Sequence, residues 1–298
     1  MPATGRWWAD EDRSVDGVPG AGGRGATGSA EPPSGGCPFC VGGIEAPDRY
    51  DTFAFPNRWP SFPDDRCEVV LYGPDHGASL WSLGTEQVRK VVDLWAERTT
   101  ALGWREDVAY VLVFENHGAD VGATIDHPHG QVFAFEEVPE LPARELARLA
   151  EGHSLLEDDP AGERVVAEHG GWRAWVPYAS AYPHGVRVAP LVRRPDLASL
   201  DDRERNGLAA MLVDVLGRLD HRYPSPMPYM MWWHQRPTDG GEWPSAWLHL
   251  EIAGPWRAEG VMRFVAGGEL GSGTFINPVA PEEAAAALRG AAPPRATV

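Results

Sequence analysis

The residues best suited to chemistry lie in His127-Pro128-His129-Gly130-Gln131. Proline fixes its own φ and restricts the residue before it to extended backbone, which predicts a rigid presentation of the two imidazoles. We expect one ring to face a reaction centre, as a nucleophile or base, and the other to face a support such as a metal. Gln131 adds a neutral donor and acceptor that never takes up a proton. The alternative is a pair of surface histidines in a proline turn.

A second group is Cys37-Pro38-Phe39-Cys40, which holds two of the three cysteines. Three cysteines do not make a disulfide framework, so in a reducing compartment this CxxC is either a redox pair or half of a metal site. A redox pair would need a thioredoxin-like setting, and here a Gly/Pro loop precedes the motif. A zinc site needs about four N or S ligands, and we nominate His76 and His127 as the other two. Cys67 is expected to be an ordinary core cysteine.

Composition limits the classes of protein. A net charge of −17 on 298 residues argues against a grip on nucleic acid or adhesion to an anionic membrane. The sequence has no apolar run of about 18 residues and no basic-then-apolar leader, so we expect a soluble, cytoplasmic protein. The length allows one large domain or two fused units, and 43% hydrophobic residues can form a real core.

Hydrophobic patterning predicts the elements that position these residues. Residues 1–36 are rich in Gly, Pro, Ser and Ala without a hydrophobic period, which predicts a disordered or loosely docked arm. Pro142 is expected in the first turn of a short helix, with Glu145 in the same turn. Strands are expected at residues 52–56, 68–72, 109–114, 132–135, 172–176, 186–191 and 229–233. Two long helices are expected: one is capped by Thr85, with Val88, Val91, Val92 and Trp95 buried, and the other spans about 202–220, with Leu208, Met211, Leu212, Val215 and Leu219 buried.

The same order of elements occurs twice, once in residues 37–160 and again in residues 161–298. In the second copy His249-Leu250-Glu251 takes the place of the first histidine segment, with Glu251 where the nucleophile candidate stands. We therefore predict an α+β fold that duplicates one unit, with two mostly antiparallel sheets and helices packed on them. Only the first half is expected to perform histidine chemistry.

Taken in order, these motifs resemble the galactose-1-phosphate uridylyltransferase family of the histidine-triad superfamily. The resemblance covers about residues 37–289 and implies two fused histidine-triad halves, usually assembled as a homodimer. The motifs that carry it are CPFC at 37–40, Asn57 within PNRWPSF, GPDH at 73–76, FEN at 114–116, HPHGQ at 127–131, Pro228-Tyr229, WHQ at 233–235, His249-Leu250-Glu251 and RFVAGGELGSGTFIN at 263–277.

The activity that the resemblance implies is uridylyl transfer. His129 would attack the α-phosphorus of a UDP-sugar such as UDP-glucose and release a sugar 1-phosphate. A second sugar 1-phosphate, such as galactose 1-phosphate, would then take the uridylyl group in a ping-pong cycle. Hydrolases of the superfamily carry a third histidine where Gln131 stands, and an amide there suits an intermediate that must avoid water.

The resemblance also assigns binding residues. Asn57, Asn116 and Thr124 match places that contact the nucleotide, and Gly122 matches the close turn before them. Cys37, Cys40, His76 and His127 match a structural zinc site. Glu145, His234, His249 and Glu251 match a second metal site for iron or zinc, with a buried polar network as the alternative. Arg263, Phe264 and Glu269 match the segment that contacts the sugar phosphate.

Departures from the family pattern concern the acceptor. Family members begin with arginines that grip the sugar phosphate, whereas Arg6 and Arg13 flank an acidic cluster here. Gly268 stands where the family has a tyrosine or serine that touches the hexose. One alternative is a divergent nucleotidyltransferase or phosphorylase that uses an adenylyl donor or another phosphorylated acceptor. Another alternative is a non-catalytic nucleotide-binding scaffold. The presence of both His129 and Gln131 argues against it.

Overall fold

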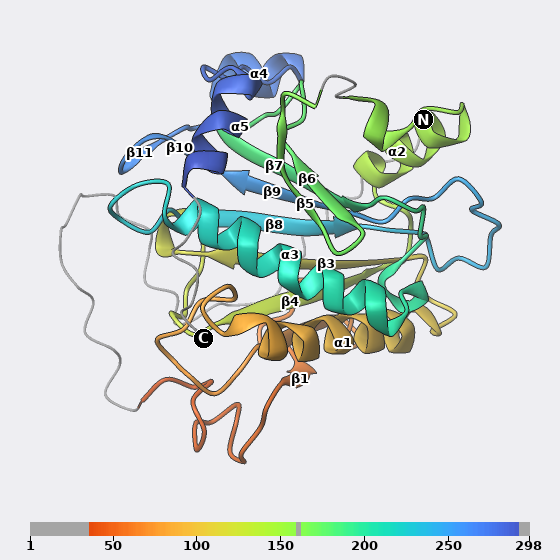
Figure 1. Cartoon of the computed structure of the whole chain (residues 1–298). Coiled ribbons are helices and arrows are strands. Elements are labelled where there is room, and N and C mark those ends of the chain that lie inside the picture. Colours follow the sequence, from red (N-terminus) through yellow and green to blue (C-terminus); the bar gives the residue numbers. More distant parts are fainter. Residues whose placement is uncertain (1–35, 159–161, 292–298) are drawn as a thin grey trace. The chain divides into compact units, whose positions relative to one another are not determined.

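The computed structural model describes residues 36–158 and 162–291 (Figure 1). The predicted N-terminal arm, with Arg6 and Arg13, lies outside them apart from Gly36. The helices are α1 (Gly84–Gly103), α2 (Glu140–Ala150), α3 (Asp202–Asp220), α4 (Gly267–Ser272) and α5 (Pro281–Gly290), with 3-10 turns at Ala119–Val121, Leu155–Asp158 and Leu197–Ser199. The strands are β1 (Phe53–Pro56), β2 (Cys67–Leu71), β3 (Tyr110–His117), β4 (His129–Phe135), β5 (Val165–His169), β6 (Trp172–Trp175), β7 (His184–Pro190), β8 (Tyr229–His234), β9 (His249–Gly254), β10 (Trp256–Ala258) and β11 (Val261–Met262).

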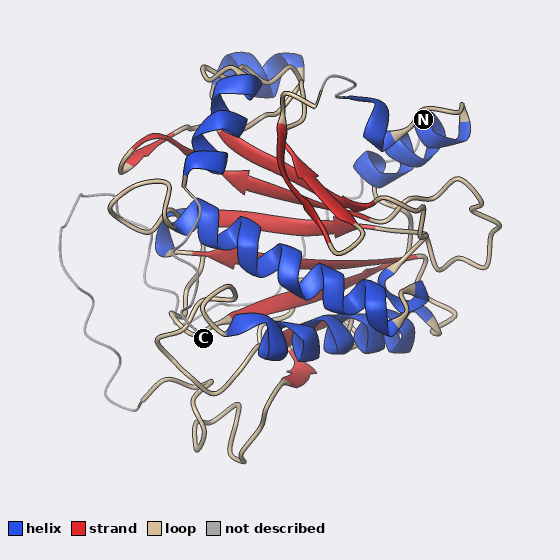
Figure 2. Cartoon of the chain, in the orientation of Figure 1, coloured by secondary structure: helices blue, strands red, loops and turns tan. Residues whose placement is uncertain are grey.

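Nine strands of the described chain form one antiparallel sheet in the order β1-β2-β4-β3-β8-β9-β7-β6-β5 (Figure 2). We expected two sheets, one for each half, but β3 and β8 pair directly, with Phe114 opposite Trp232, and join the halves. The order is symmetric about this pair, because β4, β2 and β1 correspond to β9, β7 and β6. The predicted α+β class and the repeated unit are confirmed, with β5 as an additional edge strand and β10–β11 as a separate hairpin.

One face of the sheet carries the main hydrophobic core. Helices α1 and α3 pack against each other over this face (Figures 1 and 2). The predicted apolar stripes of both helices are buried there, which confirms both amphipathic patterns. A smaller cluster of Phe39, Val69 and Leu71, packed against Phe55 and Ile125, lies on the opposite face near the start of β4. The chemistry-bearing residues therefore belong to the face that α1 and α3 leave open.

The helix starts differ from one another. The prediction that Thr85 caps α1 was wrong, because Leu83 is at the N-cap and no side chain caps the helix. Bonds from Leu83 N–H to Ser79 O and from Gly84 N–H to Trp81 O show that a turn leads directly into the helix, so it needs no Ser or Thr cap. Pro142 lies in the first turn of α2 as predicted, whereas Glu145 lies one turn further on.

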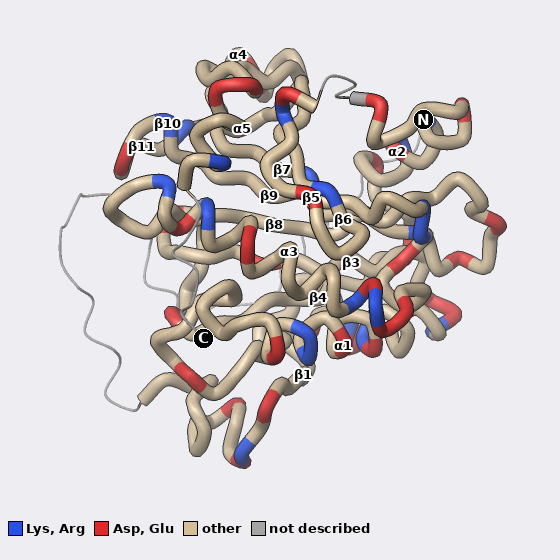
Figure 3. The backbone as a smooth tube through the Cα atoms, in the orientation of Figure 1, with Lys and Arg blue, Asp and Glu red and all other residues tan. Residues whose placement is uncertain are grey.

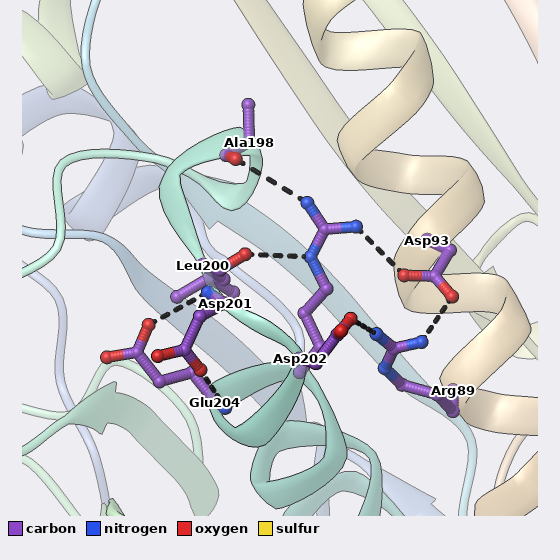
Figure 4. Close-up of polar contacts among 8 residues, drawn as sticks. Arg89, Asp93, Ala198, Leu200, Asp201, Asp202 and Glu204 are labelled. Atoms are coloured by element: carbon purple, nitrogen blue, oxygen red, sulfur yellow. Dashed lines mark hydrogen bonds and ion pairs between the residues drawn. The ribbon is translucent and has the colours of Figure 1, made fainter.

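A network of ion pairs joins α1 of the first half to the start of α3 in the second (Figure 4). Arg89 contacts both Asp93 and Asp202, the latter at 2.7 Å. Arg205 donates to Asp93 Oδ1 at 2.9 Å and to the Leu200 carbonyl at 3.0 Å. The two helices are thus tied by charged groups at the edge of the core that they share.

Arg205→Ala is expected to lower the free energy of unfolding by about 1–2 kcal/mol, because it removes one partly screened ion pair and a bond to a backbone carbonyl. Reversible denaturant unfolding measures the change. The matched control is Lys90→Ala, whose ion pair with Asp51 is more exposed and which should change stability by less than about 0.5 kcal/mol. Equal effects of the two substitutions would contradict a specific role for the network.

Acidic and basic residues are mixed along the same elements of the described chain (Figure 3). Helix α3 illustrates this, since its first turn contains Asp202 and Glu204 beside Arg203 and Arg205. Local ion pairs, more than a field of one sign, therefore characterise this surface. None of the helices in residues 36–158 and 162–291 is both long and apolar enough to cross a lipid bilayer.

Candidate active site

His129 is the first residue of β4, and the backbone fixes its ring. Nδ1 lies 2.6 Å from the His127 carbonyl oxygen. Because a carbonyl only accepts hydrogen bonds, Nδ1 carries the proton and donates it, which leaves the lone pair on Nε2. Burial lowers the pKa of the imidazole, while the bond to His127 raises it. The result is a neutral ring with one free nitrogen held in a set direction.

The ring lies on the wall of a pocket of about 410 Å³. Gln131 follows two residues later on the same face of β4, because side chains alternate along a strand. Apolar and aromatic surfaces with a few convergent polar groups are typical of small-molecule sites. The pocket is also lined by the predicted nucleotide residues Asn57 and Thr124 and by the rings of Phe39, Phe55 and Trp59.

Two of the four predicted nucleotide residues lie outside this lining. Asn116 and Gly122 are close together, since a Cβ added to Gly122 would be 3.9 Å from Asn116 Nδ2, but neither lines the pocket. Gly122 has a φ of 93°, in the left-handed region that favours glycine, and ends the turn after β3. Asn57 Oδ1 accepts the Trp59 N–H at 2.9 Å, which shapes the turn and leaves the amide nitrogen for a ligand.

Sequence reasoning missed an ion pair on the pocket wall, between Arg58 Nε and Glu45 Oε1 at 2.8 Å. Arg58 directly follows Asn57, so its place was available from the sequence. Glu45 lies in an irregular loop after Cys40, and no pattern identifies it. The pair adds one guanidinium and one carboxylate to an otherwise mostly apolar lining.

The four residues predicted for zinc converge. One ligand atom from each of Cys37, Cys40, His76 and His127 lies within 4.8 Å of the others. His127 Nδ1 is 3.8 Å from Cys37 Sγ and 3.7 Å from Cys40 Sγ, and His76 Nδ1 is 3.6 Å from Cys40 Sγ. Tetrahedral Zn–S bonds of about 2.3 Å and Zn–N bonds of about 2.0 Å place sulfur and nitrogen about 3.6 Å apart. The spacing and the donor set both fit a tetrahedral zinc centre.

His127 connects this centre to the candidate nucleophile. Its Nε2 lies 2.9 Å from the Gly73 carbonyl, so Nε2–H donates and Nδ1 is left to face the cysteines. Tyr50 Oη lies 2.9 Å from the same Nε2 and donates to the Phe39 carbonyl. The carbonyl of His127 is the group that fixes His129, so whatever orders His127 also orders the candidate nucleophile.

A second convergent group lies where Glu145 of α2 meets the end of β8 and the start of β9. Glu145 Oε2 is 2.5 Å from His234 Nδ1 and 3.3 Å from His249 Nε2, and none of these atoms has a hydrogen bond of good geometry. The fourth predicted residue, Glu251, is bound by Arg187, with 2.5 Å between Nε and Oε1. Its Oε1 is 3.9 Å from His249 Nε2, so Glu251 lies at the edge of this group.

Strand register changes the predicted correspondence between the halves. His249 begins β9 as His129 begins β4, and its Nδ1 also lies near the carbonyl two residues earlier, at 2.8 Å. Gln131 pairs with Phe114 on β3, and Glu251 pairs with Trp232 on β8. Phe114 and Trp232 in turn pair with each other where β3 meets β8. The counterpart of His129 is therefore His249 and not Glu251, which corresponds to Gln131. Spacing along the sequence does not fix register, and the predicted alignment was two residues out.

The residues predicted for the sugar phosphate are folded onto one another. Arg263 and Glu269 are buried and ion-paired, and Glu269 also accepts the N–H groups of Ala266 and Ile276 at 2.9 Å. Phe264 is 77% exposed. None of the three residues lines the His129 pocket of the described chain. Their contact with a substrate stays a prediction.

Comparison with known proteins gives consistent matches. Residues 63–139 match "Galactose-1-phosphate uridyl transferase, N-terminal domain", and residues 136–295 match the C-terminal domain of the same name. The chain is 32% identical to a galactose-1-phosphate uridylyltransferase of Thermotoga maritima, over 85% of the chain and 88% of that protein. A solved uridylyltransferase structure is 31% identical, with a TM-score of 0.80 over 89% of the chain and 93% of its own. An ADP-glucose phosphorylase from Arabidopsis thaliana, 23% identical, shares the fold, with a TM-score of 0.77 over 87% of the chain and 92% of its own.

Proposed function

Because the chain belongs to the galactose-1-phosphate uridylyltransferase family, we propose that it moves a uridylyl group between UDP-glucose and galactose 1-phosphate. The transfer runs in two steps through a uridylyl-histidine at His129. The observation that carries the proposal is the 2.6 Å contact of His129 Nδ1 with the His127 carbonyl, which leaves Nε2 for a substrate on the wall of a pocket that Asn57 and Thr124 also line. Galactose 1-phosphate is proposed as the acceptor because the similar proteins are galactose-1-phosphate uridylyltransferases. Arg263, Phe264 and Glu269 are the residues proposed to contact it.

In the first step, Nε2 of His129 forms a bond to the α-phosphorus of UDP-glucose. The bond from that phosphorus to the oxygen of glucose 1-phosphate breaks, and the departing phosphate is a stable anion that needs no proton. In the second step, a phosphate oxygen of galactose 1-phosphate attacks the same phosphorus, His129 leaves, and UDP-galactose forms. The Nδ1–H bond to the His127 carbonyl holds the ring in both steps and stabilises the positive charge that the ring carries between them.

Gln131→His is expected to raise hydrolysis of UDP-glucose relative to uridylyl transfer by at least about tenfold. The amide of Gln131 can hydrogen-bond phosphoryl oxygens, but it neither gives a proton to a leaving group nor takes one from water. An imidazole at the same place on β4 does both. The measurement is the amount of UMP released for each UDP-galactose formed. Gln131→Asn is the control that keeps an amide, and an unchanged ratio in Gln131→His would refute this account of the glutamine.

For the Cys37, Cys40, His76 and His127 group we propose zinc as the bound metal. When bound, zinc supplies a cross-link and no catalysis, because four protein ligands leave no open position. It would tie the loop before β1 to the segment that leads into β4. A second metal, iron or zinc, is proposed at Glu145, His234 and His249, whose ligand atoms converge without good hydrogen bonds; Glu251 would be its neighbour.

The proposal includes a homodimer and a cytoplasmic location. Phe264, Leu270, Phe275 and Ile276 lie close together in the sequence and are all exposed, and exposed apolar side chains of this kind support a protein partner surface. Metal-binding thiolates suit a reducing compartment. Light scattering of the purified protein would measure the mass of the assembly.

The experiment that tests the function is the intact mass of the protein after incubation with UDP-glucose and no acceptor. A gain equal to UMP is expected, and galactose 1-phosphate should remove it with formation of UDP-galactose. ADP-glucose is the matched donor, because the shared fold with an ADP-glucose phosphorylase leaves the base open. An AMP-sized gain would replace uridylyl with adenylyl transfer. No gain with either donor would support the scaffold alternative and overturn the proposal.

A further inference from the structure

A buried acid and two tyrosines lie behind the strand that carries His129. Glu115 on β3 is 2% exposed, and Tyr229 on β8 donates a hydrogen bond to its Oε1 at 2.8 Å. The other carboxyl oxygen, Oε2, and the hydroxyl of the fully buried Tyr72 have no hydrogen-bond partner of good geometry within the described chain. The two groups are nevertheless close enough for hydrogen bonding between them to affect the pKa of each. A hydrogen bond between Oε2 and the Tyr72 hydroxyl would satisfy both atoms, and burial favours the neutral carboxyl as its donor because it raises the pKa of Glu115.

Tyr72 touches the backbone on both sides of His129. Its N–H donates to the Pro128 carbonyl at 3.1 Å, one residue before the nucleophile. Its hydroxyl lies against Gly130, one residue after the nucleophile, as shown by the 2.1 Å that would separate Oη from a Cβ added at Gly130. Gln87 Nε2 holds the Tyr72 carbonyl at 2.8 Å. Tyr72 therefore sets the course of the backbone that presents His129, and the hydroxyl is why residue 130 has no side chain.

We propose that Glu115 is a positioning residue for His129. In its neutral form, Glu115 donates a hydrogen bond from Oε2 to the Tyr72 hydroxyl and accepts one from the Tyr229 hydroxyl. These bonds hold Tyr72 in contact with the backbone on both sides of His129. Glu115 does not line the substrate pocket. Its two tyrosine partners belong to the core cluster that α1 and α3 cover. The inference rests on the proposed function, in which His129 is the nucleophile.

The surroundings keep Glu115 neutral. Burial raises its pKa to about 8, although the two tyrosine hydroxyls act in the opposite direction. His117, on the same strand, has Nδ1 3.9 Å from Oε1, and burial lowers the pKa of this histidine, so it is uncharged at neutral pH. Asp220, at the end of α3, acts on Tyr229 and His117 and adds only negative charge. On the other elements that contact Tyr72, helix α1 presents Trp95 and β4 presents Gly130, and neither residue has a side chain that titrates.

The sign of the pH dependence follows from the raised pKa. The folded chain holds the Glu115 proton more tightly than the unfolded chain does, so this contribution to stability is fully present below the ordinary pKa of 4.5. It is lost as pH rises through about 8. The substrate-free protein should therefore lose stability across that range. The rate at which UDP-glucose labels His129 should fall about tenfold by one unit above the pKa, where about one carboxyl in ten remains neutral.

Two substitutions separate the roles of Glu115. Glu115→Gln donates and accepts without titrating, so it should label at close to the wild-type rate at neutral pH. It should also lack the alkaline fall and be about tenfold faster than wild type one unit above the pKa. Glu115→Leu keeps much of the packing but donates nothing. It should label about 10- to 100-fold more slowly, with the KM for UDP-glucose little changed, because the ring is misplaced while the pocket remains.

The matched control is Glu68→Gln, since Glu68 is a buried carboxylate on β2 that is paired with Arg98 at 2.6 Å. It should lower stability and keep the wild-type pH profile. Labelling of Glu115→Leu at the wild-type rate would overturn the proposal, and so would an alkaline fall that persists in Glu115→Gln. If Glu115→Leu does not fold, the Glu115→Gln profile decides alone.

The NMR signals of the His129 ring provide a reading without any substrate. The proposal requires the Nδ1–H tautomer at neutral pH in wild type and in Glu115→Gln, and a mixture of tautomers in Glu115→Leu and in wild type above the pKa of Glu115. An unchanged tautomer in all variants overturns it. If no donor labels the wild-type protein, the proposed function fails by itself, and the ring signals still decide the role of Glu115.

Discussion

His129→Ala is expected to abolish the uridylyl adduct and to lower turnover of UDP-glucose by about 10⁴-fold or more. In the proposed mechanism both half-reactions pass through a bond between Nε2 and phosphorus, so removal of the ring removes the intermediate as well as a contact. Among the described residues that line the pocket, no other is a histidine that could replace it. The measurements are intact mass with UDP-glucose alone and steady-state formation of UDP-galactose.

The control for this loss is His169→Ala. His169 lies at the end of β5, away from the pocket lining, and its Nε2 is 3.3 Å from an Asp214 carboxylate oxygen. This substitution should keep both the adduct and the turnover. The melting temperature of His129→Ala should stay within a few degrees of wild type, because the partly buried ring makes a single hydrogen bond, to the His127 carbonyl. An adduct that still forms in His129→Ala would place the nucleophile elsewhere.

The sequence was sufficient for features that depend on local pattern. Val88, Val91, Val92 and Trp95 recur at helical spacing, and hydrophobic burial leaves one orientation for such a stripe, so α1 and its buried face could be predicted. The ordered motifs were sufficient in another way, because CxxC and HPHGQ carry side chains whose chemistry suggests their partners. The two cysteines indicated that two further ligands were needed, and the predicted pair, His76 and His127, does converge on them.

Features that depend on register or on distant partners could not be predicted. Whether His249 or Glu251 matches His129 depends on how β9 pairs with β8, and a shift of two residues keeps the same face, so the hydrophobic pattern does not decide it. The same holds for charges whose partner lies far along the chain. Arg187 forms an ion pair with Glu251, which lies 64 residues further along the chain, and no pattern in the sequence predicts this pairing.

Cys37→Ser is expected to lose bound zinc and stability together. A hydroxyl is a poor zinc ligand at neutral pH, and a tetrahedral site with three ligands holds the metal much more weakly. Because the metal binds the folded arrangement, its loss removes folding free energy, by about 3 kcal/mol or more. For a chain of this size that corresponds to a fall of roughly 6–12 °C in melting temperature. Elemental analysis and thermal unfolding, each with and without a chelator, measure the two losses.

The third cysteine offers a matched control within the same chain. Cys67 is buried on β2, outside the convergent group, and its Sγ accepts the Phe62 N–H at 3.3 Å. Cys67→Ser should keep the zinc and lose no more than about 1 kcal/mol, since a hydroxyl can accept the same bond. The chelator should lower the melting temperature of wild type and Cys67→Ser, and should leave Cys37→Ser almost unchanged. A wild-type protein that contains no metal, or whose melting temperature ignores the chelator, would refute the zinc assignment. His127 would then be held by the contacts of its Nε2 with the Gly73 carbonyl and the Tyr50 hydroxyl, and through His127 these contacts would order His129.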